Sequence, residues 1–144
     1  IKDKSLDVVT MWHVMEHIQD PDKMWDELHR ILNDTGAAVI AVPNSASYDA
    51  QKYKEYWAAY DVPRHLWHFT PSTITHWSKK HGFLLEKQYT MPFDGFYISM
   101  LSERYKGSRM PGIKGLWNGV KGWFATCTRR EASSSIIYVF RKKR

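Results

Sequence analysis

Two apolar, β-branched runs flanking one helical pattern constrain the fold of this 144-residue chain more than any other feature. The runs are Leu6–Trp12 (LDVVTMW) and Ala37–Val42 (AAVIAV), and both are too continuous for strands with one face in water. Between them, Asp20 and Pro21 are suited to the start of a helix that continues to about Leu32. This order predicts a parallel βαβ unit with a right-handed crossover.

The rest of the chain predicts more helices and two more strands. Helical patterns cover part of 45–60, then 71–82, 94–105 and 113–127, and strand patterns cover 84–90 and 134–140. The sequence therefore predicts an α/β architecture. A strand at Leu6–Trp12 that is covered on both faces needs a neighbour on each side, so we expect the chain to be the second half of a larger domain.

Composition excludes several classes of protein. With 43% hydrophobic and 15% aromatic residues the chain is not disordered, and its single cysteine, Cys127, excludes an intrachain disulfide and a four-cysteine zinc site. No apolar run reaches 18 residues and no signal pattern opens the chain, so we expect a cytoplasmic location. Four of the net +6 charges lie in the tail Arg141–Arg144, so charge does not indicate nucleic-acid binding.

The densest cluster of chemical groups is His13-Val14-Met15-Glu16-His17. It matches the H-x-x-E-H pattern of inverted zincins, in which two histidines one helical turn apart bind zinc. Such a peptidase needs a long helix through both histidines. Here the cluster lies between a strand and Asp20-Pro21, so a metallopeptidase is the third and weakest of the functions considered.

Five segments of the chain together resemble class I S-adenosylmethionine-dependent methyltransferases. The segments are 6–9, 13–21, 38–44, 63–70 and 81–83, and they are most similar to the ubiquinone-type O-methyltransferases and the type 11/23-like members. The resemblance implies a Rossmann-like sheet ordered 3-2-1-4-5-7-6, its seventh strand antiparallel. This chain would supply strands 4, 5, 6 and 7, with a helical insertion between strands 6 and 7.

On this template the chain is a partial methyltransferase domain with five parts. They are a βαβ core (1–44), a substrate-side loop (45–70), a helix and strand (71–92), a helical insertion or lid (93–130), and the last strand with its basic tail (131–144). The glycine-rich turn and the ribose-binding acidic residue of the family's first half are not in this sequence. We therefore expect the fragment alone to be inactive.

The resemblance also implies roles for residues after the first strand. Trp12 and His13 would flank the methionine end of S-adenosylmethionine, while Glu16 and His17, with His13 as a further donor, would hold a divalent cation. The alternative is that Glu16 and His17 only bond to the backbone at the strand-to-helix turn.

The loop after the second strand supplies the expected acceptor site. We expect Arg64, His65, Trp67 and His68 to contact substrate, with His65 or His13 as the residue that accepts a proton. The alternative is that Arg64 pairs with Asp61 and that Trp67 belongs to the core.

The helix predicted over 113–127 is basic, rich in tryptophan and amphipathic. Its apolar stripe indicates a core-facing helix, a lid over the substrate or a weak contact with a membrane surface, and of the last two the lid is favoured.

Two functions of different class remain. One is methyl transfer to a small or lipid-like acceptor. The other is a non-catalytic interaction module, in which the isolated fragment forms a homodimer through the free edge of its first strand.

Overall fold

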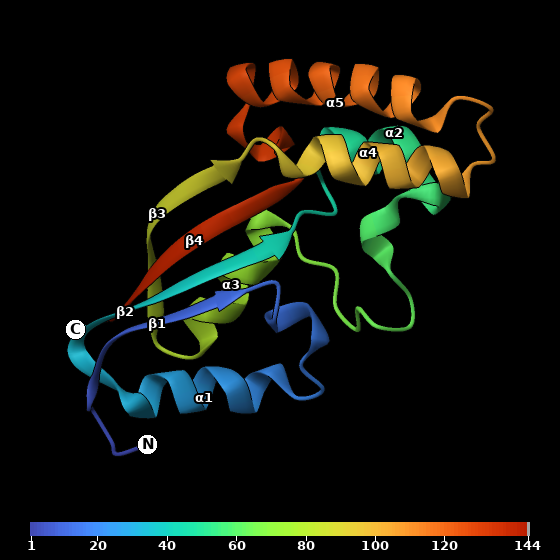
Figure 1. Ribbon diagram of the computed structural model, residues 1–144. Coiled ribbons are helices and arrows are strands. Elements are labelled where there is room, and N and C mark those ends of the chain that lie inside the picture. The colour runs from blue at the N-terminus through green and yellow to red at the C-terminus, as the bar shows by residue number, and fades with distance from the viewer. Residues whose placement is uncertain (144) are drawn as a thin grey trace.

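The computed structural model describes residues 1–143 as a four-stranded mixed sheet with helices against one face and a helical layer at one end (Figure 1). The strands are β1 (Leu6–Trp12), β2 (Leu32–Pro43), β3 (Phe83–Met91) and β4 (Ser135–Lys142). Their order is β1-β2-β4-β3, with β1 parallel to β2 and β4 antiparallel to both of its neighbours. Arg144, the last residue of the basic tail, lies outside the described residues.

The strand order agrees with the order that the resemblance implies, because the last strand lies between the second and third and runs antiparallel to them. The assignment of these strands to positions 4, 5, 7 and 6 of a seven-stranded sheet stays a prediction. β2 is longer than the apolar run suggested, because residues 32–36 also adopt extended structure.

Five helices accompany the sheet within residues 1–143: α1 (Pro21–Ile31), α2 (Tyr48–Tyr53), α3 (Pro71–Lys80), α4 (Asp94–Tyr105) and α5 (Pro111–Thr128). Short 3₁₀ turns lie at Met15–His17, Lys54–Tyr56, Ala58–Tyr60 and Arg130–Ala132. The helix within 45–60 is shorter than its pattern predicts, because Lys54 has φ 50° and ends α2 there. Within the described part of the chain, none of these helices is both long and apolar enough to cross a membrane.

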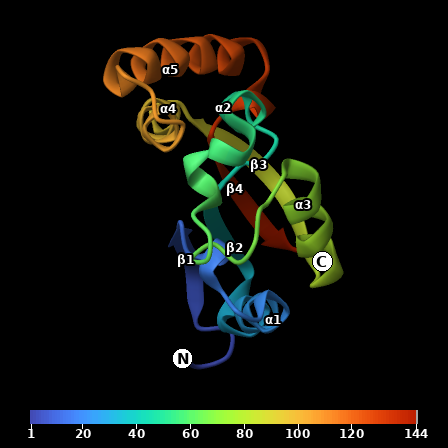
Figure 2. The ribbon, with the colours of Figure 1, turned by 90° about the vertical axis from the view of Figure 1, so that its right-hand side faces the viewer.

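Local sequence explains where α1 and α3 begin. The Asp20 side chain accepts a hydrogen bond from the Lys23 backbone N–H (3.1 Å), and Thr70 and Thr73 form a reciprocal capping box. Both helices pack against the same face of the sheet (Figure 2). The buried Trp25 ring of α1 lies 5.4 Å from Phe83 and 5.3 Å from Phe140, which fixes α1 over β3 and β4.

Within the described residues Leu6–Trp12 is paired on one side and covered on one face, so the expectation that it is covered on both faces inside a larger sheet stays a prediction. β1 is an edge strand, and Val8 and Trp12 are 53% and 51% exposed. The reason is that α1 and α3 cover one face only, so the opposite face and the outer edge of β1 remain open (Figure 2).

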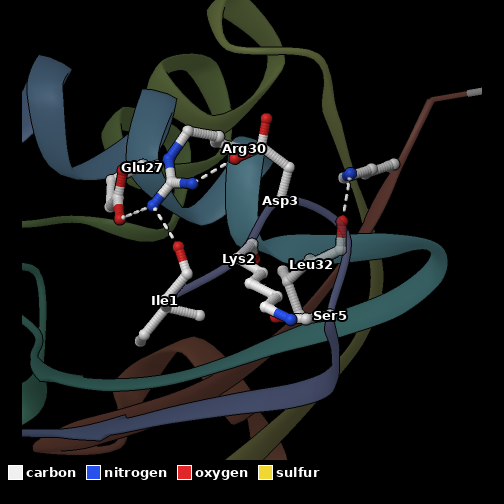
Figure 3. Close-up of polar contacts among 8 residues, drawn as sticks. Ile1, Lys2, Asp3, Ser5, Glu27, Arg30 and Leu32 are labelled. Carbon is white, nitrogen blue, oxygen red and sulfur yellow. Dashed lines mark hydrogen bonds and ion pairs between the residues drawn. The ribbon is translucent and has the colours of Figure 1, made fainter.

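Residues 1–5 are tied to the last turns of α1, and the contacts of Arg30 among them are drawn in Figure 3. The Arg30 guanidinium bonds to the Asp3 carboxylate, to both Glu27 oxygens and to the Ile1 carbonyl. The backbone N–H groups of Lys4 and Ser5 donate to the carbonyls of Arg30 and Ile31, both at 2.9 Å. These bonds set the register in which β1 enters the sheet beside β2.

Candidate active site

His13 occupies a sharp turn directly after β1. Its backbone has φ 54°, in the left-handed region, and its N–H still donates to the Ala41 carbonyl of β2 at 3.0 Å. Its Nδ1 lies 3.2 Å from Glu16 Oε1 and its Nε2 lies 3.5 Å from Asp94 Oδ2. A strand that ends at Trp12, followed by a 3₁₀ turn of three residues, rules out the long helix of an inverted zincin.

The two carboxylates beside His13 control its charge. Asp94 and then Glu16 raise the pKa of His13 to about 9, against the opposing effect of its burial. Burial of Asp94 opposes ionisation, but hydrogen bonds from His13 and Ser135 outweigh it and lower the pKa of that carboxyl. At neutral pH His13 and Asp94 therefore form an imidazolium–carboxylate pair.

The loop after α2 and its two 3₁₀ turns brings His65 to the same place. His65 is mostly buried, its Nδ1 lies 2.8 Å from the Ala59 carbonyl, and its Nε2 lies 3.8 Å from Asp61 Oδ2. Because Nδ1 donates to a carbonyl, the neutral ring carries its free lone pair on Nε2. Asp61 also accepts a hydrogen bond from Arg64 Nη2 at 2.8 Å, as the sequence alternative predicted.

A cavity of about 360 Å³ lies between the carboxyl ends of β1 and β2, the loop and α4. Its polar side is formed by His13, Asp94, Asp61, Arg64 and His65. Its lining also includes apolar and aromatic side chains of α4, namely Tyr97, Ile98, Leu101 and Tyr105. The structure thus brings together three of the residues singled out in the sequence: His13, Arg64 and His65.

Three other residues singled out in the sequence lie outside this cavity. Trp12 ends β1 with half of its side chain exposed at the free edge of the sheet. The Trp67 indole donates to the Ile18 carbonyl (2.8 Å) and packs edge-on against Trp77, while His68 Nε2 lies 3.0 Å from the Tyr60 carbonyl.

Glu16, His17 and His65 form a cluster next to the cavity. One ligand atom from each can be chosen so that all three lie within 4.8 Å of one another. Glu16 is fully buried, and its Oε2 has no hydrogen-bond partner among the described residues. His17 Nδ1 lies 2.9 Å from the Arg64 carbonyl, so both histidines point a free Nε2 away from the backbone, as histidine ligands of metals usually do.

Sequence reasoning missed Asp94 and the α4 face. Asp94 lies three residues past β3, and β3 runs in the same direction as β1 and β2 because both β3 and β2 are antiparallel to β4. Its strand therefore ends at the same edge as His13. Only this direction of β3 could have indicated that Asp94 belongs to the site, because no local sequence motif marks it.

Comparisons with known proteins agree with this geometry. The family model described as a methyltransferase domain matches residues 2–88, more than half of the chain. A search of curated proteins found no match.

Several solved methyltransferases share the fold. An S-adenosylmethionine-dependent methyltransferase from Thermotoga maritima has a TM-score of 0.61 and 15% identity, and the chain covers 59% of it. Phosphoethanolamine N-methyltransferase 2 from Haemonchus contortus has a TM-score of 0.55 and 19% identity, and the chain covers 34% of it. The 1,6-didemethyltoxoflavin-N1-methyltransferase from Burkholderia thailandensis has a TM-score of 0.56 and 11% identity, and the chain covers 46% of it. Each match includes 99% of this chain, which spans about a third to three fifths of those proteins.

Proposed function

This chain belongs to the methyltransferase domain family, and we propose that the protein transfers a methyl group from S-adenosylmethionine to a small acceptor in the cavity beside β1 and β2. The observation that carries the proposal is the mixed lining of that cavity, in which polar side chains from the end of β1, the loop and the start of α4 lie with apolar and aromatic side chains of α4. Ligands of open α/β sheets bind at this edge. The Burkholderia thailandensis enzyme was solved with bound 1,6-didemethyltoxoflavin, a small molecule. Because the chain spans only part of such proteins, the activity is proposed for the whole protein and not for residues 1–144 alone.

The lining of the cavity suggests how an acceptor is oriented. Its apolar part would pack against Ile98 and Leu101 of α4, where contact with apolar side chains displaces water. Its hydroxyl or amine group would then face His65 of the loop. Arg64, partly neutralised by Asp61, would face any carboxylate or phosphate that the acceptor carries. A small or lipid-like acceptor with one nucleophilic O–H or N–H group fits this arrangement best.

His65 is the proposed general base. As the acceptor oxygen or nitrogen forms its bond to the methyl carbon, the acceptor proton passes to His65 Nε2, and Asp61 at 3.8 Å stabilises the resulting imidazolium. His13 is a weaker candidate because its raised pKa keeps it protonated at neutral pH. Its role is then to hold a positive charge at the strand end and to orient Asp94 and Glu16.

The residues present fit one end of the cofactor. S-adenosylmethionine supplies an electrophilic methyl group, whose C–S bond breaks with its electron pair going to sulfur. The exposed Trp12 ring and His13 lie side by side in the sequence at the free edge of β1, where they would contact the methionine end. No glycine lies between β1 and α1, so the backbone of this turn cannot closely approach the rest of the S-adenosylmethionine molecule.

Calorimetric titration with S-adenosylhomocysteine tests the cofactor site. We expect the whole protein to bind it, residues 1–144 alone to bind it far more weakly, and Trp12→Ala to weaken binding by the whole protein about tenfold. Trp117→Ala, at a similarly exposed tryptophan of α5, is the matched control and should leave binding unchanged. Failure of the whole protein to bind would contradict the proposal.

With an acceptor in hand, His65→Gln should lower kcat about 100-fold while His76→Gln does not.

We also propose that Glu16, His17 and His65 hold a divalent cation. Glu16, whose Oε2 has no hydrogen-bond partner among the described residues, and one ring nitrogen from each histidine would make a donor set of one carboxylate and two imidazoles. That set suits Zn²⁺, Fe²⁺ or Co²⁺ better than Mg²⁺, which prefers oxygen ligands. Such a cation would polarise an acceptor oxygen and lower its pKa. His65 cannot bind it and act as base through the same nitrogen, so the two roles exclude each other.

Titration with Co²⁺, followed by its visible absorption, distinguishes the two roles of His65 as a cation ligand and as the general base. We expect binding near one equivalent that is lost in Glu16→Gln and in His17→Ala but kept in His76→Ala, a histidine on α3. Binding that survives both cluster substitutions would place the ion elsewhere. Absence of binding would leave His65 as the base.

A further inference from the structure

Helix α5 packs on α4 through its smallest residues. A Cβ atom added to Gly115 would come within 2.5 Å of the Met100 backbone, and one added to Gly119 would come within 2.6 Å of the Phe96 ring. The other buried residues of α5 are Asn118 and Thr126. The apolar stripe therefore cannot be the inward face, and the expectation of a core-facing stripe is wrong.

The apolar residues of α5 point into solvent instead. Figure 1 shows α5 as the outermost layer of the molecule, beyond α4. Large side chains along one face of α5 are 41–69% exposed: Ile113, Leu116, Trp117, Trp123 and Phe124. Met110, just before the helix, is 53% exposed and extends the patch. A continuous exposed surface of this kind on a folded domain marks an interaction site.

The segment that carries this face, residues 104–130, has charges of one sign only. Residues 104–130 include seven Lys and Arg residues and no Asp or Glu, and all seven basic side chains are exposed. Lys114 and Lys121 lie along one border of the apolar face, and Lys121 Nζ lies 5.4 Å from the centre of the Trp117 ring. Arg129 and Arg130 follow the end of α5. A long basic side chain beside an apolar stripe can reach up to phosphates while its stem stays in an apolar layer.

We propose that α5 lies flat on an anionic lipid surface, with Ile113, Trp117 and Phe124 in the boundary between headgroups and acyl chains. Amphipathic helices that bind in this way combine bulky apolar residues on one face with Lys and Arg at its borders. Charge decides against a second copy of the chain as the partner, because two such faces would bring basic residues against basic residues. An anionic membrane complements the charge and buries the apolar side chains together.

The proposal is independent of methyl transfer, and its test needs no cofactor or acceptor. The full chain is sedimented with vesicles of phosphatidylcholine and with vesicles in which about one third of the lipid is phosphatidylglycerol. We expect binding to the anionic vesicles only, weakening as salt increases. Trp117→Ser combined with Phe124→Ser should lower the partition coefficient about tenfold per side chain, and Lys114→Gln combined with Lys121→Gln about fivefold per charge.

Matched double variants elsewhere in the chain serve as controls. Leu84→Ser with Tyr89→Ser changes exposed apolar residues of β3, and Lys2→Gln with Lys79→Gln removes the same charge from the opposite end of the molecule. Both should bind as the parent does, and thermal unfolding verifies that every variant is folded.

Three results would overturn the proposal. The first is a lack of binding to anionic vesicles. The second is equal loss of binding in the control variants. The third is a concentration-dependent dimer that Trp117→Ser with Phe124→Ser abolishes, which would assign the face to a second copy of the chain.

Discussion

His13 connects three parts of the molecule through its charge. The residue lies after β1, Glu16 lies in the next turn, and Asp94 begins α4 about eighty positions further along the chain. The sequence could predict that His13 lies at the carboxyl edge of the sheet, because an apolar, β-branched strand ends beside it. It could not predict the pairing with Asp94, because that pairing depends on where β3 lies in the sheet.

The raised pKa of His13 predicts a pH dependence of stability. The pKa is about 9 in the folded protein and 6.5 for a histidine in the unfolded chain, so the protonated form is the one that folding favours. The contribution is complete below about pH 6.5 and is lost as pH rises through 9. Urea unfolding between pH 6 and 10 should show this loss, and His13→Gln should remove it.

The matched control for this experiment is His76→Gln, on α3 and away from the two carboxylates. It should keep the pH dependence of the parent. A parent protein whose free energy of unfolding does not fall between pH 7 and 10 would contradict the assigned ion pairs of His13 with Glu16 and Asp94.

At the scale of elements, α5 shows how a helical pattern can be recognised while its orientation is misjudged. Its limits, Pro111–Thr128, are close to the predicted 113–127. Which face is buried depends on how near α4 comes, and the glycines allow a backbone approach that larger residues would block. Buried hydrogen bonds then fix α5 against α4 and α2. Asn118 Nδ2 of α5 donates to Glu103 Oε1 of α4 (3.1 Å) and to Tyr53 Oη of α2 (2.9 Å).

Substitution of the glycines should reverse the usual rule for helices. Glycine to alanine in an exposed helix stabilises by up to about 1 kcal/mol. Gly115→Ala and Gly119→Ala should instead destabilise by about 1–3 kcal/mol, because the added methyl group meets Met100 and Phe96. Gly112→Ala, in the first turn of α5 with nothing within 4 Å, is the control and should be neutral or stabilising. Urea unfolding of the three variants measures this, and equal effects at all three positions would contradict the packing of α5 on α4.

At the scale of the whole molecule, β1 leaves an unpaired edge. Its backbone groups pair with β2 on one side only, and Val8 is exposed beside them. An open edge of this kind can pair with another strand, from the same protein or from a second copy. The non-catalytic alternative, an isolated fragment that dimerises, rests on this edge.

We predict that residues 1–144 self-associate through β1 at high concentration. Val8→Lys should shift the chain toward monomer, because a charge on the edge disfavours pairing. Leu84→Lys, on β3 at the other border of the sheet, is similarly exposed and should change association less. Light scattering over a concentration series measures the mass, and a monomer at every concentration would refute the prediction.

The sequence by itself determined the elements of this protein and the identity of its family. Strand β1, α4 and the start of α1 lie where the apolar runs and the caps predict them, because hydrophobic periodicity and helix capping act over a few residues. The tertiary structure alone decided that α1 and α3 cover one face of the sheet, that α5 turns its apolar stripe outward, and that Asp94 reaches His13. Those outcomes depend on contacts between segments far apart in the chain, and a local pattern holds no information about which distant surface it will meet.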